Sequence, residues 1–170
     1  TDYKPLLEFA KANNLGFIAT NVPRRYANLV YRKGFEGLEE LSETGKSFLP
    51  PLPVPYDPEV PAYKNMLAMM GGHGGEGAEN FPKAQAIKDA TMAHFILKNQ
   101  KEDHLFIHYN GSYHSDNKEG IGWYLLQYNK DIQIVNITTI QVDDLNKIPE
   151  EELGKADFIL ATPKTMTTTY

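Results

Sequence analysis

Apolar side chains recur at helical spacing in several stretches of the chain. In the longest stretch, "NFPKAQAIKDATMAHFILKN" (80–99), they occupy most of the helix circumference, so this helix is predicted to be largely buried. Asn80 is the expected cap. The other predicted helices are a short one after Pro5, "RRYANLVYRK" (24–33) ending at Gly34, "FEGLEELSE" (35–43), "AYKNMLAMM" (62–70) and "EGIGWYLLQY" (119–128).

Short apolar runs between these helices have the length and composition of buried strands. They lie at 15–21, 104–109, 132–140 and 157–162. Because strands alternate with helices, the chain predicts an α/β fold with a largely parallel β-sheet flanked by helices on both faces. Residues 1–170 are expected to form a single α/β domain. Its proline-rich connector at 45–61 is expected to run extended over the surface, outside the core.

Composition narrows the function classes. The 170 residues are 41% hydrophobic and 23% charged, as in an ordinary globular domain. A net charge of −5 without a basic block argues against nucleic acid as a partner. The absence of cysteine excludes disulfides, thiolate metal sites and cysteine nucleophiles. The chain begins at Thr1 without a methionine, so we expect a processed protein or part of a longer one.

Two segments follow predicted strands, where parallel sheets bind their ligands: residues 21–25 and residues 111–114. After Gly111 frees the chain to turn, His114 is predicted either to face a ligand cleft or to make a turn hydrogen bond. His108, inside the predicted strand, is expected to point inward, hydrogen-bonded and neutral. His104 is expected to be solvated.

Three charged residues have both a functional and a structural interpretation. Arg24 begins a helix, where backbone N–H groups favour an anion such as a carboxylate or phosphate. For its neighbour Arg25 a surface ion pair is the favoured alternative. Asp89 lies in the most apolar helix and needs a partner there, either a histidine that it orients, an arginine, or a purely structural ion pair.

The run "GGHGGEG" (71–77) lacks the lysine and the serine or threonine of a phosphate-binding loop, and it follows a helix. Met66, Met69, Met70 and His73 gather near it, beside Tyr63. Methionine suits irregular apolar pockets for flat ligands, with core packing as the alternative for each residue.

Three segments together resemble one family: "NVPRRYA" after a strand, "QAIKDATMA" on the buried helix and "NGSYH" after the next strand. They are similar to the ChaN-like haem-binding uptake proteins, which are related to the Tiki peptidases and more distantly to erythromycin esterase-like proteins. The resemblance implies a haem-binding carrier of bacterial iron acquisition. It also implies an exported protein, periplasmic or anchored to the outer membrane by a lipid, that holds haem between subunits with a tyrosine on the iron.

Carried onto this chain, the resemblance implies a set of haem-binding residues. Tyr26, Tyr63 and Tyr113 are the candidate iron ligands, because phenolate suits ferric iron. Propionates are expected to meet Arg24 and Lys64. The remaining members of the predicted set are Met69, Met70, His73 and His114.

The chain also departs from the family pattern. Family members begin with a strand ending in Gly-Glu-x-His and then carry a second acidic motif, and neither is present here. The resemblance therefore implies the carboxyl-terminal part of the domain, with strand edges covered by a second copy in a homodimer or by a companion amino-terminal fragment. The alternative function is a metal-dependent hydrolase, in which His114 and Asp89 help hold a divalent metal. We expect a carrier rather than an enzyme.

Overall fold

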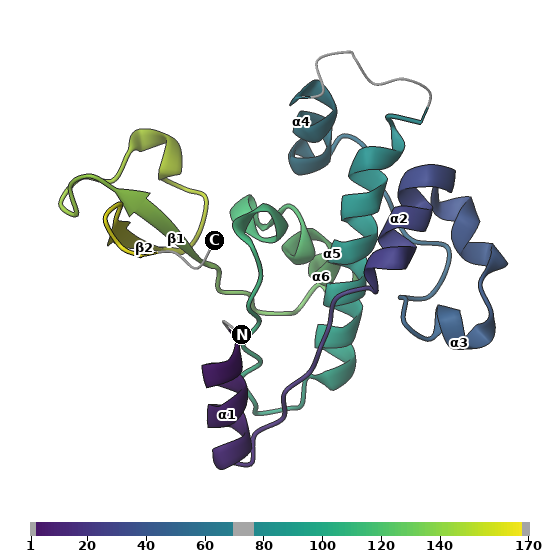
Figure 1. Cartoon of the computed structure of the whole chain (residues 1–170), viewed down its shortest axis with the longest axis horizontal. Helices are drawn as coiled ribbons and strands as arrows, with labels where there is room; N and C mark the ends of the chain where they lie inside the picture. Colours follow the sequence, from purple (N-terminus) through teal and green to yellow (C-terminus); the bar gives the residue numbers. More distant parts are fainter. Residues whose placement is uncertain (1–2, 70–76, 168–170) are drawn as a thin grey trace.

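The computed structural model describes residues 3–69 and 77–167, and its helices gather around one long central helix (Figure 1). That helix is α5 (Asn80–Asn99). Three helices pack against it: α2 (Arg24–Lys33), α4 (Pro61–Met69) and α6 (Ile121–Tyr128). The other elements are α1 (Lys4–Ala12), α3 (Glu43–Lys46), β1 (Ile137–Val142), β2 (Phe158–Pro163) and four short 3-10 helices, η1 (Phe35–Glu40), η2 (Ser112–His114), η3 (Asp116–Lys118) and η4 (Glu150–Glu152).

The core surrounds α5, as its apolar sequence predicts. Ala86, Ile87, Ala90 and Ala93 on this helix are completely buried. Alanines let neighbouring helices approach closely, while a buried isoleucine contributes about 1.5–3 kcal/mol of transfer free energy. The predicted bounds of this helix are confirmed, although Asn80 is its first residue and Glu79 precedes it as the cap.

The proline-rich segment 45–61 lies partly in the core, so the expectation of a connector outside the core is wrong. Leu49, Val54 and Val60 are buried and belong to the hydrophobic core. The Tyr124 hydroxyl donates a hydrogen bond to the backbone oxygen of Pro55 at 2.7 Å. The segment runs through turns and bends, and the apolar residues between the prolines turn inward.

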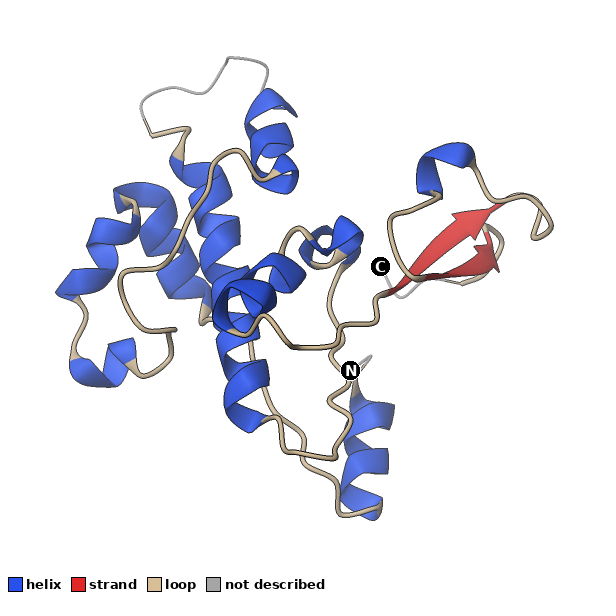
Figure 2. Ribbon diagram, turned by 180° about the vertical axis from the view of Figure 1, so that it is seen from behind, coloured by secondary structure: helices blue, strands red, loops and turns tan. Residues whose placement is uncertain are grey.

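The sheet consists of two parallel strands, which confirms the α/β class. β1 and β2 pair from Ile137↔Phe158 to Val142↔Pro163. They lie at one side of the molecule, beside the helices (Figure 2). One face of β1 buries Thr138 and Val142 and the other leaves Ile137 exposed, so helices do not cover both faces as expected. The predicted strand at 157–162 is confirmed, and the one at 132–140 begins later, at Ile137.

The predictions of sheet strands at 15–21 and 104–109 are wrong. Both segments are extended but join no ladder among the described residues. An apolar run fixes the extended conformation and the alternation of side chains, whereas a strand also needs a neighbour for its backbone groups. The two segments meet through side chains alone: Thr20 Oγ1 lies 2.8 Å from Nε2 of His108.

In the described ranges, no helix is both long and apolar enough to cross a membrane.

Candidate functional site

A buried carboxylate on α5 organises the side chains predicted to carry function. Asp89 is completely buried. It accepts a hydrogen bond from the Tyr63 hydroxyl of α4 at 2.9 Å, and its other oxygen lies 2.5 Å from Nδ1 of His114. A carboxylate inside the core is tolerated only with such partners. Of the partners considered for Asp89, the structure shows the histidine.

Burial and hydrogen bonding shift the pKa values of Asp89 and Tyr63. Burial raises the pKa of Asp89, and the hydrogen bonds from His114 and Tyr63 act in the opposite direction. Burial and the nearby charge of Asp89 raise the pKa of Tyr63 far above its usual value. Tyr63 therefore remains a neutral phenol, a hydrogen-bond donor rather than a source of phenolate.

The contact with Asp89 also decides which histidine nitrogen is available. Nδ1 of His114 faces the carboxylate, so its proton lies on that side and Nε2 is left for another partner. The side-chain amide nitrogen of Gln85, one turn before Asp89 on α5, lies 3.5 Å from Nε2 of His114, which in this tautomer can accept its N–H. His114 is thus held from two successive turns of α5.

A glycine allows the His114 loop to lie against α5. A Cβ at Gly120 would overlap the backbone oxygen of His114 and approach Oδ2 of Asp89 to 3.2 Å. Gly120 therefore marks a close approach of backbone to backbone. Neither Gln85 nor Gly120 emerged from the sequence, because no local pattern shows which residues the loop folds against.

Hydrogen bonds tie the other side of this loop to the sheet. The Asn136 side chain donates to the backbone oxygen of Ser115 at 2.7 Å, and the backbone N–H of Asn117 donates to Lys155 at 2.7 Å. Thr138 donates to Asp116 at 3.2 Å. Residues 111–119 therefore form a fixed wall between α5 and β1.

A cavity of about 440 Å³ opens beside this wall. Its apolar side includes Met66 and Met69 of α4 together with Tyr113, a predicted iron ligand that is 69% exposed. The full lining is Ala62, Asn65, Met66, Met69, Ser112, Tyr113, Asp116, Asn117, Glu119, Thr138, Thr139, Ile140, Glu152 and Lys155.

The polar side of the cavity carries more negative than positive charge. Asp116, Glu119 and Glu152 face one cation, Lys155, whose ammonium lies 2.9 Å from Glu152. Burial raises the pKa of both Asp116 and Glu119. The cavity thus combines a methionine- and tyrosine-lined apolar side with an acidic end.

A family model described as "Haem-binding uptake, Tiki superfamily, ChaN" matches residues 1–125. The chain belongs to this family. Neither the curated proteins nor the solved structures gave a match. The ChaN-like resemblance of the sequence is thereby confirmed.

The ChaN match includes Asp89, His114 and Tyr113, but it covers only part of the cavity wall. β1 and the segment that carries Glu152 and Lys155 lie beyond residue 125. The helical half of the site therefore belongs to the family pattern, and the sheet half lies outside the matched range.

Several predicted haem-binding residues lie away from this cavity. Arg24 is exposed at the start of α2, which lies on the other side of α5 from the strands (Figure 1). Tyr26 of the same helix is buried, and its hydroxyl accepts a hydrogen bond from Arg25 at 3.1 Å, in place of the surface ion pair favoured for Arg25. Lys64 is exposed and pairs with Glu59 at 2.6 Å. Tyr63 and His114 contact Asp89 and do not line the cavity. Met70 and His73 lie outside the described residues.

The metal alternative has two of its expected ligands in place. Asp89 and His114 contact each other, and within 3–69 and 77–167 no three ligating side chains of His, Asp or Glu come together.

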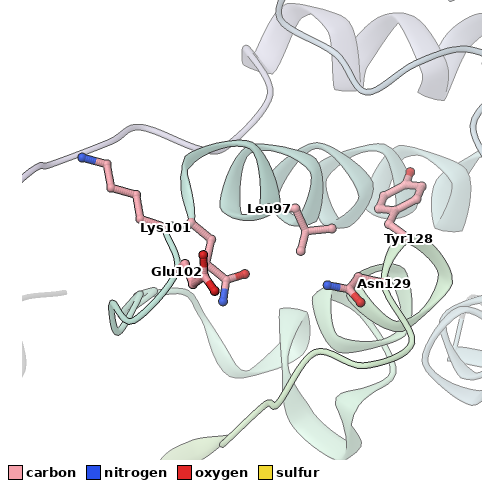
Figure 3. A pocket seen from close by; sticks show the side chains of 6 residues that line it. Leu97, Lys101, Glu102, Tyr128 and Asn129 are labelled. Carbon is pink, nitrogen blue, oxygen red and sulfur yellow. The ribbon is translucent and has the colours of Figure 1, made fainter.

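A second hollow, of about 480 Å³, lies between the carboxyl ends of α5 and α6 (Figure 3). Leu97, Tyr128 and Asn129 line one part of it, and Lys101 and Glu102 another. It contains no predicted site residue.

Proposed function

We propose that this chain is a non-catalytic haem carrier and that the porphyrin rests in the cavity beside residues 111–119. Its membership of a haem-binding uptake family supports haem as the ligand. The observation that carries the proposal is the apolar side of the cavity, where Met66, Met69 and Tyr113 lie together. Thioether and aromatic side chains suit the flat apolar face of a porphyrin.

Tyr113 is the proposed iron ligand. Its side chain is largely exposed on the cavity wall and is therefore accessible to iron, whereas the Tyr63 hydroxyl is buried against Asp89. A phenolate is a hard anionic donor that stabilises ferric iron, as a carrier requires. When bound, haem would supply only its own spectrum and redox chemistry, while the chain supplies the ligand and the apolar wall.

Charge sets the proposed orientation of the porphyrin. Three carboxylates and one lysine at the polar end disfavour the two propionates there. The propionates therefore point to solvent.

Titration with haemin tests this function. Wild-type protein is expected to give a tyrosinate-type ferric spectrum, and Tyr113→Phe is expected to lose that band and bind at least about tenfold more weakly. Tyr31→Phe, an exposed tyrosine on α2, is the matched control and keeps the wild-type spectrum. No spectral change on adding haemin, or equal loss in both variants, would contradict the proposal.

The Asp89–His114 contact favours a second candidate, a metal-dependent hydrolase. A carboxylate on Nδ1 is how proteins orient a histidine whose Nε2 binds metal. Such a site would need further ligands from a companion amino-terminal fragment or a second copy. Metal analysis and peptidase or esterase assays of the full-length protein, comparing wild type with His114→Ala, distinguish the two candidates. Equal or absent metal in both proteins, with no cleavage by wild type, removes the hydrolase.

The exported location and the lipid anchor stay predictions that follow from the family. Fractionation of cells that express the full-length protein tests both, since a periplasmic or outer-membrane protein leaves the cytoplasmic fraction.

A further inference from the structure

Asn110 lies where an extended segment passes into the loop that carries Tyr113. Its side-chain nitrogen donates to the backbone oxygen of Gly111 and to the Ser115 hydroxyl, both at 2.9 Å. The bond to Ser115 joins the two ends of residues 110–115. One side-chain amide therefore closes the loop around Tyr113.

The orientation of this amide is set by His108. Nδ1 of His108 lies 3.0 Å from Oδ1 of Asn110, and its Nε2 lies 2.8 Å from Oγ1 of the buried Thr20. An amide oxygen only accepts, so a neutral His108 carries its proton on Nδ1, and Nε2 accepts from the Thr20 hydroxyl. Burial favours this neutral form, because it lowers the pKa of His108. Each donor from Thr20 to Asn110 thus meets an acceptor.

The loop itself contains little that would fix Tyr113. Its backbone forms a single 3-10 turn, in which the His114 N–H donates to Gly111 and the Ser115 N–H to Ser112, both at 2.9 Å. Such short turns have poor hydrogen-bond geometry. The Tyr113 side chain is 69% exposed, so its direction follows from the backbone of the loop.

The far end of the loop is held from the opposite side. The backbone oxygen of Ser115 accepts from the Asn136 side chain, which precedes β1. Ser115 is therefore a fixed point, and the bond from Asn110 ties the entry of the loop to it. Neither His108 nor Asn110 lines the cavity, so both act on it only through the loop.

We propose that His108 and Asn110 are positioning residues for Tyr113. His108 orients the Asn110 amide, the amide closes residues 110–115, and the closed loop presents the Tyr113 phenol to the cavity. The role of Tyr113 rests on the proposed haem function, whereas the closure of the loop is a property of the haem-free protein.

Hydrogen exchange of the haem-free protein, followed by NMR, tests the closure. Asn110→Ala removes both bonds of the amide and is expected to speed exchange of the His114 and Ser115 amides by about tenfold. Asn146→Ala is the matched control, because Asn146 also bonds within a short exposed loop, to Asp144. It is expected to leave those two amides unchanged.

Two variants of His108 separate positioning from a general loss of stability. Asparagine places its side-chain nitrogen where the imidazole has Nδ1, and glutamine where it has Nε2. His108→Asn therefore keeps the donor to Asn110, whereas His108→Gln keeps only the partner of Thr20. We expect slow exchange in His108→Asn and fast exchange of His114 and Ser115 in His108→Gln. Exchange in Asn110→Ala that is as slow as in wild type, or equal exchange in the two His108 variants, overturns the proposal.

Haemin titration then tests the effect on Tyr113. Asn110→Ala is expected to weaken the tyrosinate band and to raise the dissociation constant by about tenfold, while Asn146→Ala matches wild type. Faster exchange together with a wild-type band in Asn110→Ala would overturn the positioning of Tyr113. A wild type without the band contradicts the proposed haem function instead, and the closure of the loop is still decided by exchange in the haem-free protein.

Discussion

The helices around α5 and the extended segments 15–21 and 104–110 differ in how far their apolar side chains are buried. On α5, Ile87 and its neighbours are covered on all sides by α2, α4 and α6. Along 104–110 only every second side chain is covered, and Ile107 lies in solvent. One part of the molecule is therefore packed on all sides, and the other leaves one face exposed.

The candidate site lies where these two parts meet. Asp89 belongs to the packed part, while His114 and Tyr113 end the extended segment 104–110. The packed helix thus anchors His114, and the loop places Tyr113 on the cavity wall. Such a division lets the loop line a cavity without costing the core its packing.

The largest effect should come from truncating the same residue type in the two parts. Ile87→Ala removes fully buried methyl groups and is expected to lower the free energy of unfolding by about 2–5 kcal/mol. Ile107→Ala should change it by less than about 0.5 kcal/mol, since its side chain is already in water. Urea unfolding of the two variants beside the wild type measures both changes. Equal losses would mean that 104–110 is covered as fully as α5.

A smaller effect is expected where the loop approaches α5. Gly120→Ala forces a methyl group into the backbone oxygen of His114, at a cost of about 1–3 kcal/mol and with weaker haemin binding. Gly111→Ala is the control, because a Cβ there meets no atom within 4 Å. Thermal unfolding and haemin titration of both variants measure these effects. If Gly120→Ala has the melting temperature and haemin affinity of the wild type, the loop is not fixed against α5.

The smallest effect concerns pH. Burial lowers the pKa of His108 below its usual 6.5, so the folded protein binds this proton less readily than the unfolded chain. Stability from this group is present above pH 6.5 and is lost as pH falls through the lower folded value. His108→Gln keeps a polar partner for Thr20 and should flatten the fall in melting temperature below pH 6.5. An unchanged slope would assign the pH dependence to other groups.

The sequence predicted what depends on local pattern. The apolar run of 80–99 predicted the central helix, and a lone aspartate within it predicted a buried partner, found in His114. The alternation at 104–109 predicted the inward turn of His108, although not the missing ladder. A strand pairs its backbone with a neighbouring strand, and the sequence of one segment does not show whether such a neighbour exists.

Contacts between residues far apart in the sequence could not be predicted from local patterns. Tyr63 was considered an iron ligand, but its hydroxyl is committed to Asp89, 26 positions away. Met69 and Tyr113 do line one cavity, whereas Arg24 and Tyr26 lie on the far side of α5. Only the packing of α4 and α2 on different sides of α5 separates these candidates, and residue spacing does not encode it.

Hydrogen exchange with and without haemin tests the central claim, that haem binds beside residues 111–119, most directly. We expect haemin to slow amide exchange in 112–119 and at the end of α4, and to leave 97–102, around the second hollow, unchanged. Protection around 97–102 without protection of 112–119 would place the ligand elsewhere and contradict the account.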